Sequence, residues 1–465
     1  MRHKIIAVFF CIAATIAGSL PALGDGAPAA EQPLALEEFI RQVCRADTKF
    51  EEILMEKFRL QYLRSARLPA GDLTLAVKAQ YDFFLSEERS DPETKLSLEK
   101  LFPFSGTAIA LSYANTPASS TGSRSEFEAL ISQPIAENAF GKNTRILDKL
   151  VGTEIDVARF QIIEAYEDYL AALVSVYLSW SAAHETLHIA QTSYAQNRKL
   201  QDNIDARRRR NIALPIDVHK VRLTVIAKQE ALLVARQEFE RLSVLVNTAL
   251  RAGSAAPRIP VRPAAYQEAD IVFAEQCRRF REQSRTVAVL RLLEKQRALE
   301  LEKAADELLP SINFLFGYRE EGDERRFANR ETRLFAGISL QWPFPGQQER
   351  AAHEIAGVSR RKITLSNQNT LLSLETNLKN LYAEILRERE LLTIAEEKIE
   401  LAQAVLAHEA ENYSFGKVTL NDYIQAANVL DENRLSKVSR VLKSNTLVLE
   451  WLRLTDQLVS ERVIE

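Results

Sequence analysis

The sequence predicts a mainly helical fold with a β portion suited to a membrane, built from long helical hairpins and arranged as an internal twofold structural repeat. Three observations support this prediction. Only 15 Gly and 15 Pro occur in 465 residues, so turns are few and the elements between them are long. Stretches of apolar–polar alternation lead into very long stretches of helical periodicity. The same order of elements then occurs a second time.

The charge balance gives no support to a nucleic-acid partner. The formal net charge is −3 and the sequence pI is about 6.2, whereas nucleic-acid-binding domains are basic. The sequence contains no phosphate-binding glycine loop, no G-x-S-x-G elbow and no metal-type cysteine cluster. We therefore expect no cofactor and no enzymatic activity.

The N-terminus is typical of a secretory signal peptide. Basic residues precede the apolar stretch Ile5–Leu20, and small residues follow it. This stretch is shorter than the roughly 20 apolar residues of a membrane-spanning helix, which is the alternative interpretation. We expect a signal peptide over residues 1–24, with cleavage at about 24–30. No later segment reaches about 18 consecutive apolar residues, so an exported chain that crosses a membrane would do so through a β-barrel.

The remaining chain divides into two repeats joined by a linker. The first repeat, 31–250, begins with a helix over Leu34–Leu68, continues with β-strands within 73–133 and ends in a long helical hairpin. Residues 251–268 form the linker, which is rich in Pro. The second repeat, 269–460, has a helix over Ala269–Leu308, a β-hairpin over 311–342 and another long helical hairpin.

The strands are predicted by strict alternation. From Leu73 to Leu85 every second residue is apolar, and Leu334–Trp342 has a similar pattern. Shorter alternating stretches cover Lys95–Phe102, Thr107–Tyr113 and Phe127–Ser132. One apolar and one polar face suit a strand with lipid on one side and a polar lumen on the other.

Each long helical hairpin has a short break, or tip, at its far end, over 211–217 in the first repeat and 413–423 in the second. Asn211 and Gly416 suit the left-handed conformation that ends a helix. Asp217 and Asp422 follow where a carboxylate favours the first turn of the returning helix. If copies of the tips meet, these carboxylates would also form rings of charge that gate ions or solutes.

The doubled order of helix, Leu-Pro, alternating strands, Ser132–Pro134 or Trp342–Gly346, long helix, tip and return helix resembles the TolC-like outer-membrane efflux and secretion channels of Gram-negative bacteria. The resemblance covers nearly the whole mature chain. It implies a homotrimer in which four strands from each protomer build a shared transmembrane β-barrel in outer-membrane lipid. The helices would form a trimeric α-barrel in the periplasm.

The resemblance also implies a function. Such a channel passively conducts substrates that a periplasmic adaptor (membrane fusion) protein and an inner-membrane pump deliver, in tripartite efflux or type I secretion. Asp422 lies at the position of the family's aperture carboxylate, Gln425 at a neighbouring position that is often a second acid, and Asp217 at the matching place in the first tip. The turn from barrel to helix is marked by Pro134, Pro343, Pro345 and Gly346.

The first repeat departs from this pattern. Its β segment, from Pro69 to Pro134, is about twice as long as the segment from Pro310 to Pro343 in the second repeat. The additional residues would form either an extra hairpin or a longer extracellular loop.

A rival interpretation comes from His184-Glu-Thr-Leu-His188, which matches the H-E-x-x-H pattern of zinc metallopeptidases with Glu185 as general base. A catalytic zinc site needs a third ligand and an open coordination position. The motif lies in the middle of a long uninterrupted helix, and the following histidines, His219 and His353, lack the expected spacing. We therefore favour a helix surface here over a zinc site.

A periplasmic coiled-coil adaptor or structural rod is another alternative. It would have the same signal peptide and long helical hairpins. It does not explain strands such as Leu73–Leu85 and Leu334–Trp342, whose alternation suits a boundary between lipid and a polar lumen.

Overall fold

The computed structural model describes residues 32–84, 89–119, 122–251, 258–263, 273–323 and 328–459. The predicted signal peptide (1–24) and parts of the predicted linker lie outside these ranges. The chain forms two compact units: one comprises Met1–Leu54, Ile163–Glu282 and Leu374–Glu465, and the other Met55–Ile162 and Gln283–Ser373. The predicted class, mainly helical with an antiparallel sheet, is confirmed.

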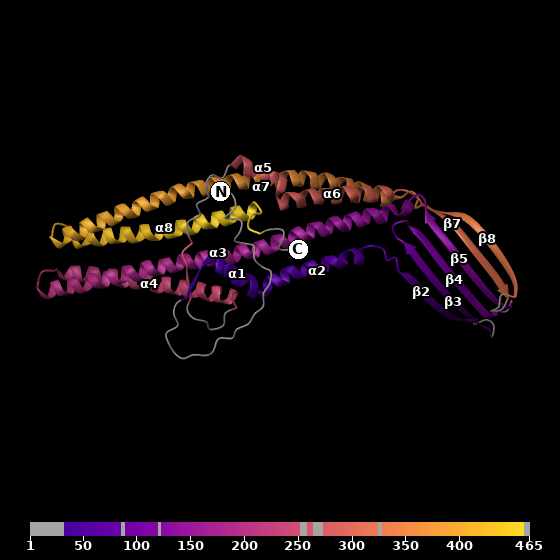
Figure 1. Ribbon diagram of the computed structural model, residues 1–465, viewed down its shortest axis with the longest axis horizontal. Helices are drawn as coiled ribbons and strands as arrows, with labels where there is room; N and C mark the ends of the chain where they lie inside the picture. Colours follow the sequence, from indigo (N-terminus) through magenta and orange to yellow (C-terminus); the bar gives the residue numbers. More distant parts are fainter. Residues whose placement is uncertain are drawn as a thin grey trace. The chain divides into compact units, whose positions relative to one another are not determined.

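Two helical hairpins of matching size dominate the helical part (Figure 1). In each, a helix of 68 residues is followed by one of 35 residues: α3 (Lys142–Arg209) and α4 (Pro215–Ala249), then α7 (Gln347–Ser414) and α8 (Leu420–Leu454). The shorter helices are α1 (Leu36–Ala46), α2 (Thr48–Arg67), the 3₁₀ turn η2 (Ala139–Gly141), α5 (Phe273–Gln283) and α6 (Arg285–Asp306).

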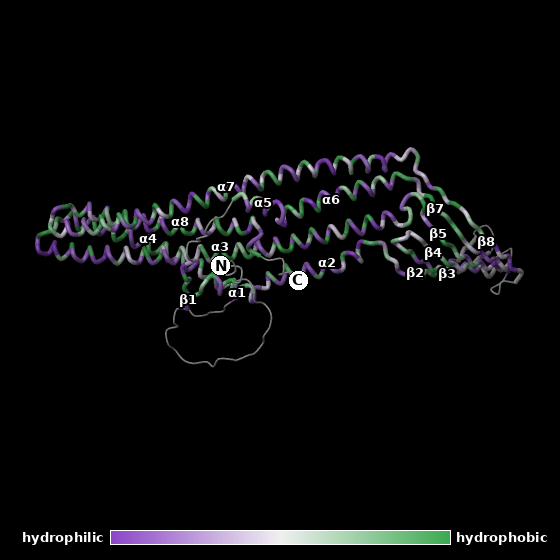
Figure 2. Tube along the Cα trace, turned by 45° about the horizontal axis from the view of Figure 1, so that its top comes forward, coloured by the Kyte–Doolittle hydropathy of each residue, from purple (hydrophilic) through white to green (hydrophobic). Residues whose placement is uncertain are grey.

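The described helices are amphipathic rather than uniformly apolar. Hydrophilic and hydrophobic residues are interspersed along each long helix (Figure 2). Among the described residues, no helix has the combination of length and hydropathy that crossing a bilayer requires.

Two helices that the sequence predicts as continuous are each divided in two. Asp47 separates α1 from α2, with an extended backbone and a side chain that accepts the Lys49 N–H over 3.0 Å. Ser284 separates α5 from α6, again with an extended backbone. Asp and Ser favour helix caps over helix interiors because their side chains compete for backbone hydrogen bonds.

A short parallel pair that the sequence did not indicate joins the start of the chain to the linker. Strand β1 (Gln32–Leu34) pairs with β6 (Arg258–Pro260). The Tyr177 hydroxyl of α3 donates to one of two carbonyls beside this pair, at 2.7 Å from Leu34 and 2.9 Å from Val261. Residues far apart in sequence are thereby anchored on one face of α3.

The second unit is built on one antiparallel sheet of six strands, in the order β2-β3-β4-β5-β7-β8 (Figure 1). The strands are β2 (Leu73–Phe84), β3 (Arg89–Phe102), β4 (Thr107–Ser119), β5 (Gly122–Pro134), β7 (Ser311–Asp323) and β8 (Ala328–Gln341). The resemblance implied four strands, so the strand count is corrected here to six. The longer β segment of the first repeat forms an extra hairpin.

The strand register separates the sheet into an apolar and a polar face. Paired residues lie on the same face, and the register from β2 to β8 is regular apart from shifts between Thr116 and Ser119 and between Glu321 and Asp323. The apolar face collects Leu73, Leu75, Val77, Leu96, Leu98, Ile109, Leu111, Phe127, Ala129, Ile131, Phe314, Phe316, Leu334, Ala336 and Ile338. The opposite face carries Lys78, Lys95, Ser97, Glu99, Ser112, Glu128 and Arg319. The predicted alternation therefore covers most of the sheet, with exceptions such as Lys100 and Glu320 on the apolar face and Leu130, Leu315 and Phe335 on the opposite face.

The junction from sheet to α3 is tightly packed. Pro134 ends β5, and Gly106, in the β3–β4 turn, has a φ of 72° and lies against it. The buried Asp306 carboxylate accepts the Asn138 N–H over 2.9 Å and pairs with Lys142 over 3.0 Å. In the second repeat, Pro343 and the cis Phe344–Pro345 bond precede Gly346, whose φ is 68°.

Gly141 provides a test of this junction. Its φ is 74°, and a Cβ at this position would overlap the backbone carbonyl of Phe104. We expect Gly141→Ala to lower the free energy of unfolding by more than about 2 kcal/mol, because left-handed strain of about 1–2 kcal/mol adds to the overlap. Denaturant unfolding of the purified protein would measure it.

The control is Gly357→Ala in α7, where nothing lies within 4 Å of the added Cβ. That variant should be as stable as the parent or slightly more so, because Ala favours helix over Gly by about 1 kcal/mol. Equal stability of the Gly141→Ala variant and the parent would contradict the described packing.

Candidate functional site: the helical tips

The two long helices that lead to the tips end in the same way. Asn211 has a φ of 60° and Gly416 a φ of 73°, the left-handed conformation in which Gly and Asn are favoured. In both tips the N–H of the next residue bonds a carbonyl five positions back over 2.9 Å, which satisfies a carbonyl that the helix end leaves open. These pairs are Ile212 with Arg207 and Lys417 with Asn412.

The tip carboxylates cap the returning helices. Asp422 accepts hydrogen bonds from the Thr419 N–H at 3.0 Å and the Thr419 hydroxyl at 2.7 Å, while the Asp422 N–H lies 3.3 Å from that hydroxyl oxygen. Asp217 accepts from the Leu214 N–H at 3.4 Å. The hydrogen bonds from the Thr419 side chain and backbone hold the pKa of the exposed Asp422 below its usual range. Asp422 is therefore ionised at neutral pH.

The tips contact each other through an apolar cluster and a cation–aromatic contact. Ile204 of α3, Val221 and Val225 of α4 and Leu420 of α8 are almost fully buried together. Tyr413 and Tyr423 stack at a centroid distance of 5.8 Å across the second tip. The guanidinium of Arg207, from the first tip, lies 5.2 Å from the ring centroid of Tyr413.

A buried charge joins three helices above this cluster. Asp431 of α8 is 8% exposed, and its carboxylate accepts the Ser193 hydroxyl of α3. The Lys228 ammonium of α4 donates to the same oxygen at 2.8 Å. A carboxylate this buried is tolerated because it is paired and hydrogen-bonded, so the link strongly favours the arrangement in which the two hairpins are side by side.

An open groove of about 590 Å³ runs between α7 and α8 beside the second tip. Its exposed apolar residues are Leu401, Val405 and Val429. Asp422 and Gln425, which the sequence analysis selected, both line it. The groove is thus lined by apolar residues together with polar and charged ones.

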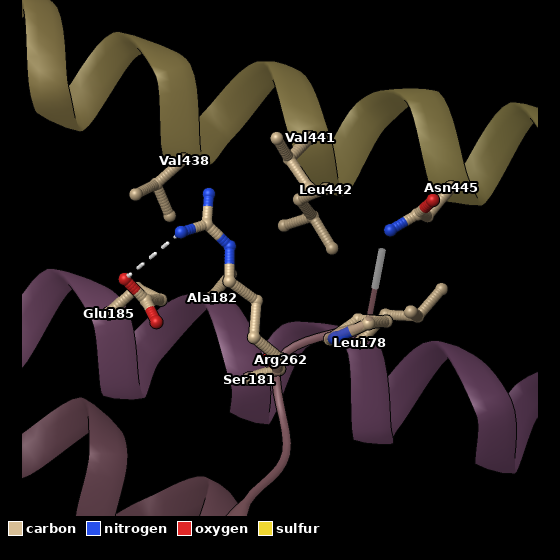
Figure 3. A pocket seen from close by; sticks show the side chains of 10 residues that line it. Leu178, Ser181, Ala182, Glu185, Arg262, Val438, Val441, Leu442 and Asn445 are labelled. Carbon is tan, nitrogen blue, oxygen red and sulfur yellow. Dashed lines mark ion pairs between the residues drawn. The ribbon is translucent and has the colours of Figure 1, made fainter. Parts of the chain in front are cut away.

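The H-E-x-x-H residues lie on α3 far along the chain from the tips. The His184 ring packs on Phe239 at 5.4 Å, and Glu185 forms an ion pair with Arg262 at 3.9 Å. Figure 3 shows this ion pair beside a small cavity of about 20 Å³ between α3 and α8. His188 is exposed. Glu185 therefore faces an arginine rather than a zinc ligand set.

Among the described residues, three ligand-type side chains come together at Glu164, Glu167 and Asp456, whose carboxylate oxygens lie within 4.8 Å of one another. Carboxylates alone suit a hard cation such as Ca²⁺ rather than zinc. Neither His184 nor His188 belongs to this cluster.

The comparisons with known proteins give matches only at the level of structure. No family model and no curated protein matches the sequence. The solved structure of CusC, described as forming a transmembrane channel, is 10% identical and matches 93% of this chain and 95% of its own, with a TM-score of 0.70. The CmeC outer membrane channel of Campylobacter jejuni is 11% identical over 92% of this chain and 88% of its own, with a TM-score of 0.69.

A third structure, the open state of the MtrE outer membrane channel of Neisseria gonorrhoeae, is 12% identical over 90% of this chain and 88% of its own, with a TM-score of 0.66. This chain has the TolC-like fold. All three of these solved structures are described as channels.

The structure places the predicted tip residues within the TolC-like fold as follows. Asn211 and Gly416 end α3 and α7, Asp217 and Asp422 begin α4 and α8, and Gln425 lies one turn further. Sequence reasoning missed Arg207 against Tyr413 and Asp431 with Lys228. An acid directly after apolar residues in a helix, as in Val429-Leu430-Asp431, is a signal that could have indicated a buried partner.

Lys228→Met tests the buried link. Removal of the ammonium leaves the Asp431 carboxylate buried beside only a hydroxyl, so we expect a loss of about 3 kcal/mol in the free energy of unfolding. Chemical denaturation would measure the loss. Lys220→Met, at an exposed position of the same helix, should change stability by less than about 0.5 kcal/mol.

The double variant Lys228→Met with Asp431→Leu separates charge burial from lost packing. Since no charge then stays buried, most of the stability should return. A double variant as unstable as Lys228→Met would show that the ion pair is not what stabilises this contact.

Proposed function

We propose that the chain is the protomer of a homotrimeric outer-membrane channel of a Gram-negative bacterium. The observation that carries this proposal is the six-stranded sheet with one apolar face, joined to long polar helical hairpins in the fold of solved outer-membrane channels. In lipid, a sheet is stable only if its backbone groups are all paired, which a closed barrel achieves. The equal lengths of α3 and α7, and of α4 and α8, support a duplicated hairpin that builds a periplasmic α-barrel.

The channel conducts passively and requires partners that supply the substrate. We propose a periplasmic adaptor protein and an inner-membrane pump, in a tripartite efflux or type I secretion system. The groove between α7 and α8 supports an adaptor, because a lining of both apolar and charged residues suits an amphipathic helix. The chemistry of the chain is gating at the tips, not covalent catalysis.

The alternative functions lack comparable support. A periplasmic rod in water would not expose a sheet with a wide apolar face, on which Val77 is 67% and Ile338 is 69% exposed. In a zinc peptidase, His184 and His188 would hold the metal together with a third ligand, and Glu185 would act as general base. Here Glu185 pairs with Arg262 instead.

The oligomeric mass of the mature protein is the decisive measurement. Light scattering coupled to size exclusion in detergent should give three chains per particle, extracted from the outer-membrane fraction. A detergent-independent monomer in the periplasmic fraction would overturn the proposal and favour the rod.

Asp422→Asn tests the gating role of the tip. A ring of three carboxylates focuses the field in a narrow mouth, so we expect polyvalent cations on the periplasmic side to block the parent channel and to block this variant several-fold less. Single-channel recording in planar bilayers would measure the block. The hydrogen bonds from Thr419 favour the ionised form and lower the pKa of Asp422, so the block should persist on acidification to pH 5. It should disappear only once the pH falls below the ordinary aspartate pKa of about 3.9.

Thr419→Ala is the matched control. It removes the hydroxyl that caps α8 and leaves the Asp422 charge in place. This variant should keep the cation block at pH 7. If both variants lose the block equally, the local structure of the tip would be responsible instead of the charge.

A further inference from the structure

We propose that three copies of this chain form a barrel of eighteen strands, closed where β2 of one copy pairs with β8 of the next. The inference rests on the proposed trimeric channel and goes beyond it, because the resemblance implied four strands from each protomer. Its basis is the hairpin β2–β3, which occupies an edge that a four-stranded protomer would leave open.

The pairing of β4 excludes a four-stranded closure. One edge of β4 is bonded to β5, and the other is bonded to β3 from Thr94–Asn115 to Phe102–Thr107. From Ala108 to Asn115, a neighbouring copy therefore finds both edges of β4 already paired. The open edges of the described sheet belong to β2 and β8.

The strand directions allow these two edges to pair. All neighbours in the sheet are antiparallel, so the six strands alternate in direction and the first runs opposite to the last. When β8 of one copy lies beside β2 of the next, the alternation continues through the contact. Three copies then close an even-numbered antiparallel ring, the arrangement found in bacterial outer-membrane barrels.

The apolar face continues through the same contact. On β2 it presents Leu75 and Val77, and on β8 it presents Leu334 and Ile338, each more than 60% exposed in a single copy. The register places all four on one face of the sheet. If β2 and β8 pair across copies, the apolar surface becomes one unbroken band around the barrel.

Both edges are long, and the charged residues of β8, Arg330, Glu331 and Arg333, all lie before Leu334. The β2–β3 pairing is regular from Leu73–Lys100 to Phe84–Arg89, and Lys78 and Asp82 are the charged residues of β2. From Leu334 to Gln341, β8 has no charged residue. Long, regular edges with few charges bind another strand, and a second copy of this chain offers the complementary edge.

An eighteen-stranded barrel has a wide lumen. Barrel diameter grows about linearly with strand number, so eighteen strands give about 1.5 times the diameter of twelve. Natural barrels of 16–18 strands enclose a water-filled channel. The polar face, with Lys78, Ser97 and Glu128, would line this lumen, which suits bulky hydrophilic solutes.

Cysteine cross-linking tests the closure. In a background with Cys44→Ser and Cys277→Ser, Val77→Cys is combined in turn with Leu334→Cys, Ala336→Cys, Ile338→Cys and Leu340→Cys. Within one copy, β2 and β8 lie five strand spacings apart, about 24 Å, so a short bifunctional thiol reagent can join them only between copies. We expect at least one pair to give covalent dimers and trimers on denaturing gels.

Two comparison pairs make the result decisive. Val77→Cys with Leu96→Cys, which are paired within the sheet, should cross-link inside one chain and show that the strands are formed. Leu111→Cys is combined with Ile338→Cys as the second pair. A cross-link between copies at this pair would indicate that β8 of one copy closes on β4 of the next. A conducting trimer that joins copies through Leu111, and at none of the Val77 pairs, would overturn the eighteen-stranded barrel and leave the channel function intact. A monomer that does not conduct would overturn the proposed function itself.

Discussion

The strand register is the constraint on which the β part of the molecule depends. Because side chains alternate along each strand, one shift of register would move every apolar residue of that strand to the polar face. The pairing from β2 to β8 has Val77, Leu96 and Tyr113 in consecutive register on one face. The extra hairpin therefore extends the apolar face instead of interrupting it. A wide exposed apolar face is unusual for a sheet in water, and it is the observation on which the proposed membrane location rests.

The helical tips depend on a different constraint, the need to satisfy backbone and charged groups where long helices end. Asn211 and Gly416 close the outgoing helices, and at the start of α8 Asp422 accepts the Thr419 N–H while the Thr419 hydroxyl accepts the Asp422 N–H. This capping explains why a carboxylate lies there without any reference to gating. The same geometry leaves the carboxylate exposed and ionised, which is the state that the proposed gating role requires.

Much of this fold is predictable from sequence because its elements are long. Few Gly and Pro residues, periodicity in the helices and alternation in Leu73–Leu85 indicate the main elements locally. Residues 89–94 of β3 were missed because Pro92 and the charges around it are atypical of a strand. The β1–β6 pair and the Asp431–Lys228 link join residues far apart in sequence, and no local pattern encodes which partner a buried group meets.

The buried Asp431–Lys228 link is complete within one copy of the chain, whereas the edges of the sheet are not paired within one copy. Asp431 gains its partners within one copy, so the contact between the α3–α4 and α7–α8 hairpins can form before any assembly. The β2 and β8 edges have no partner strand in a single copy, and their backbone groups would remain unpaired in lipid. Insertion of one copy alone would therefore be unfavourable by several kcal/mol for each unpaired group. Under the proposed assembly, the contact between the hairpins would form in an isolated chain, whereas the barrel would become stable only as the copies assemble.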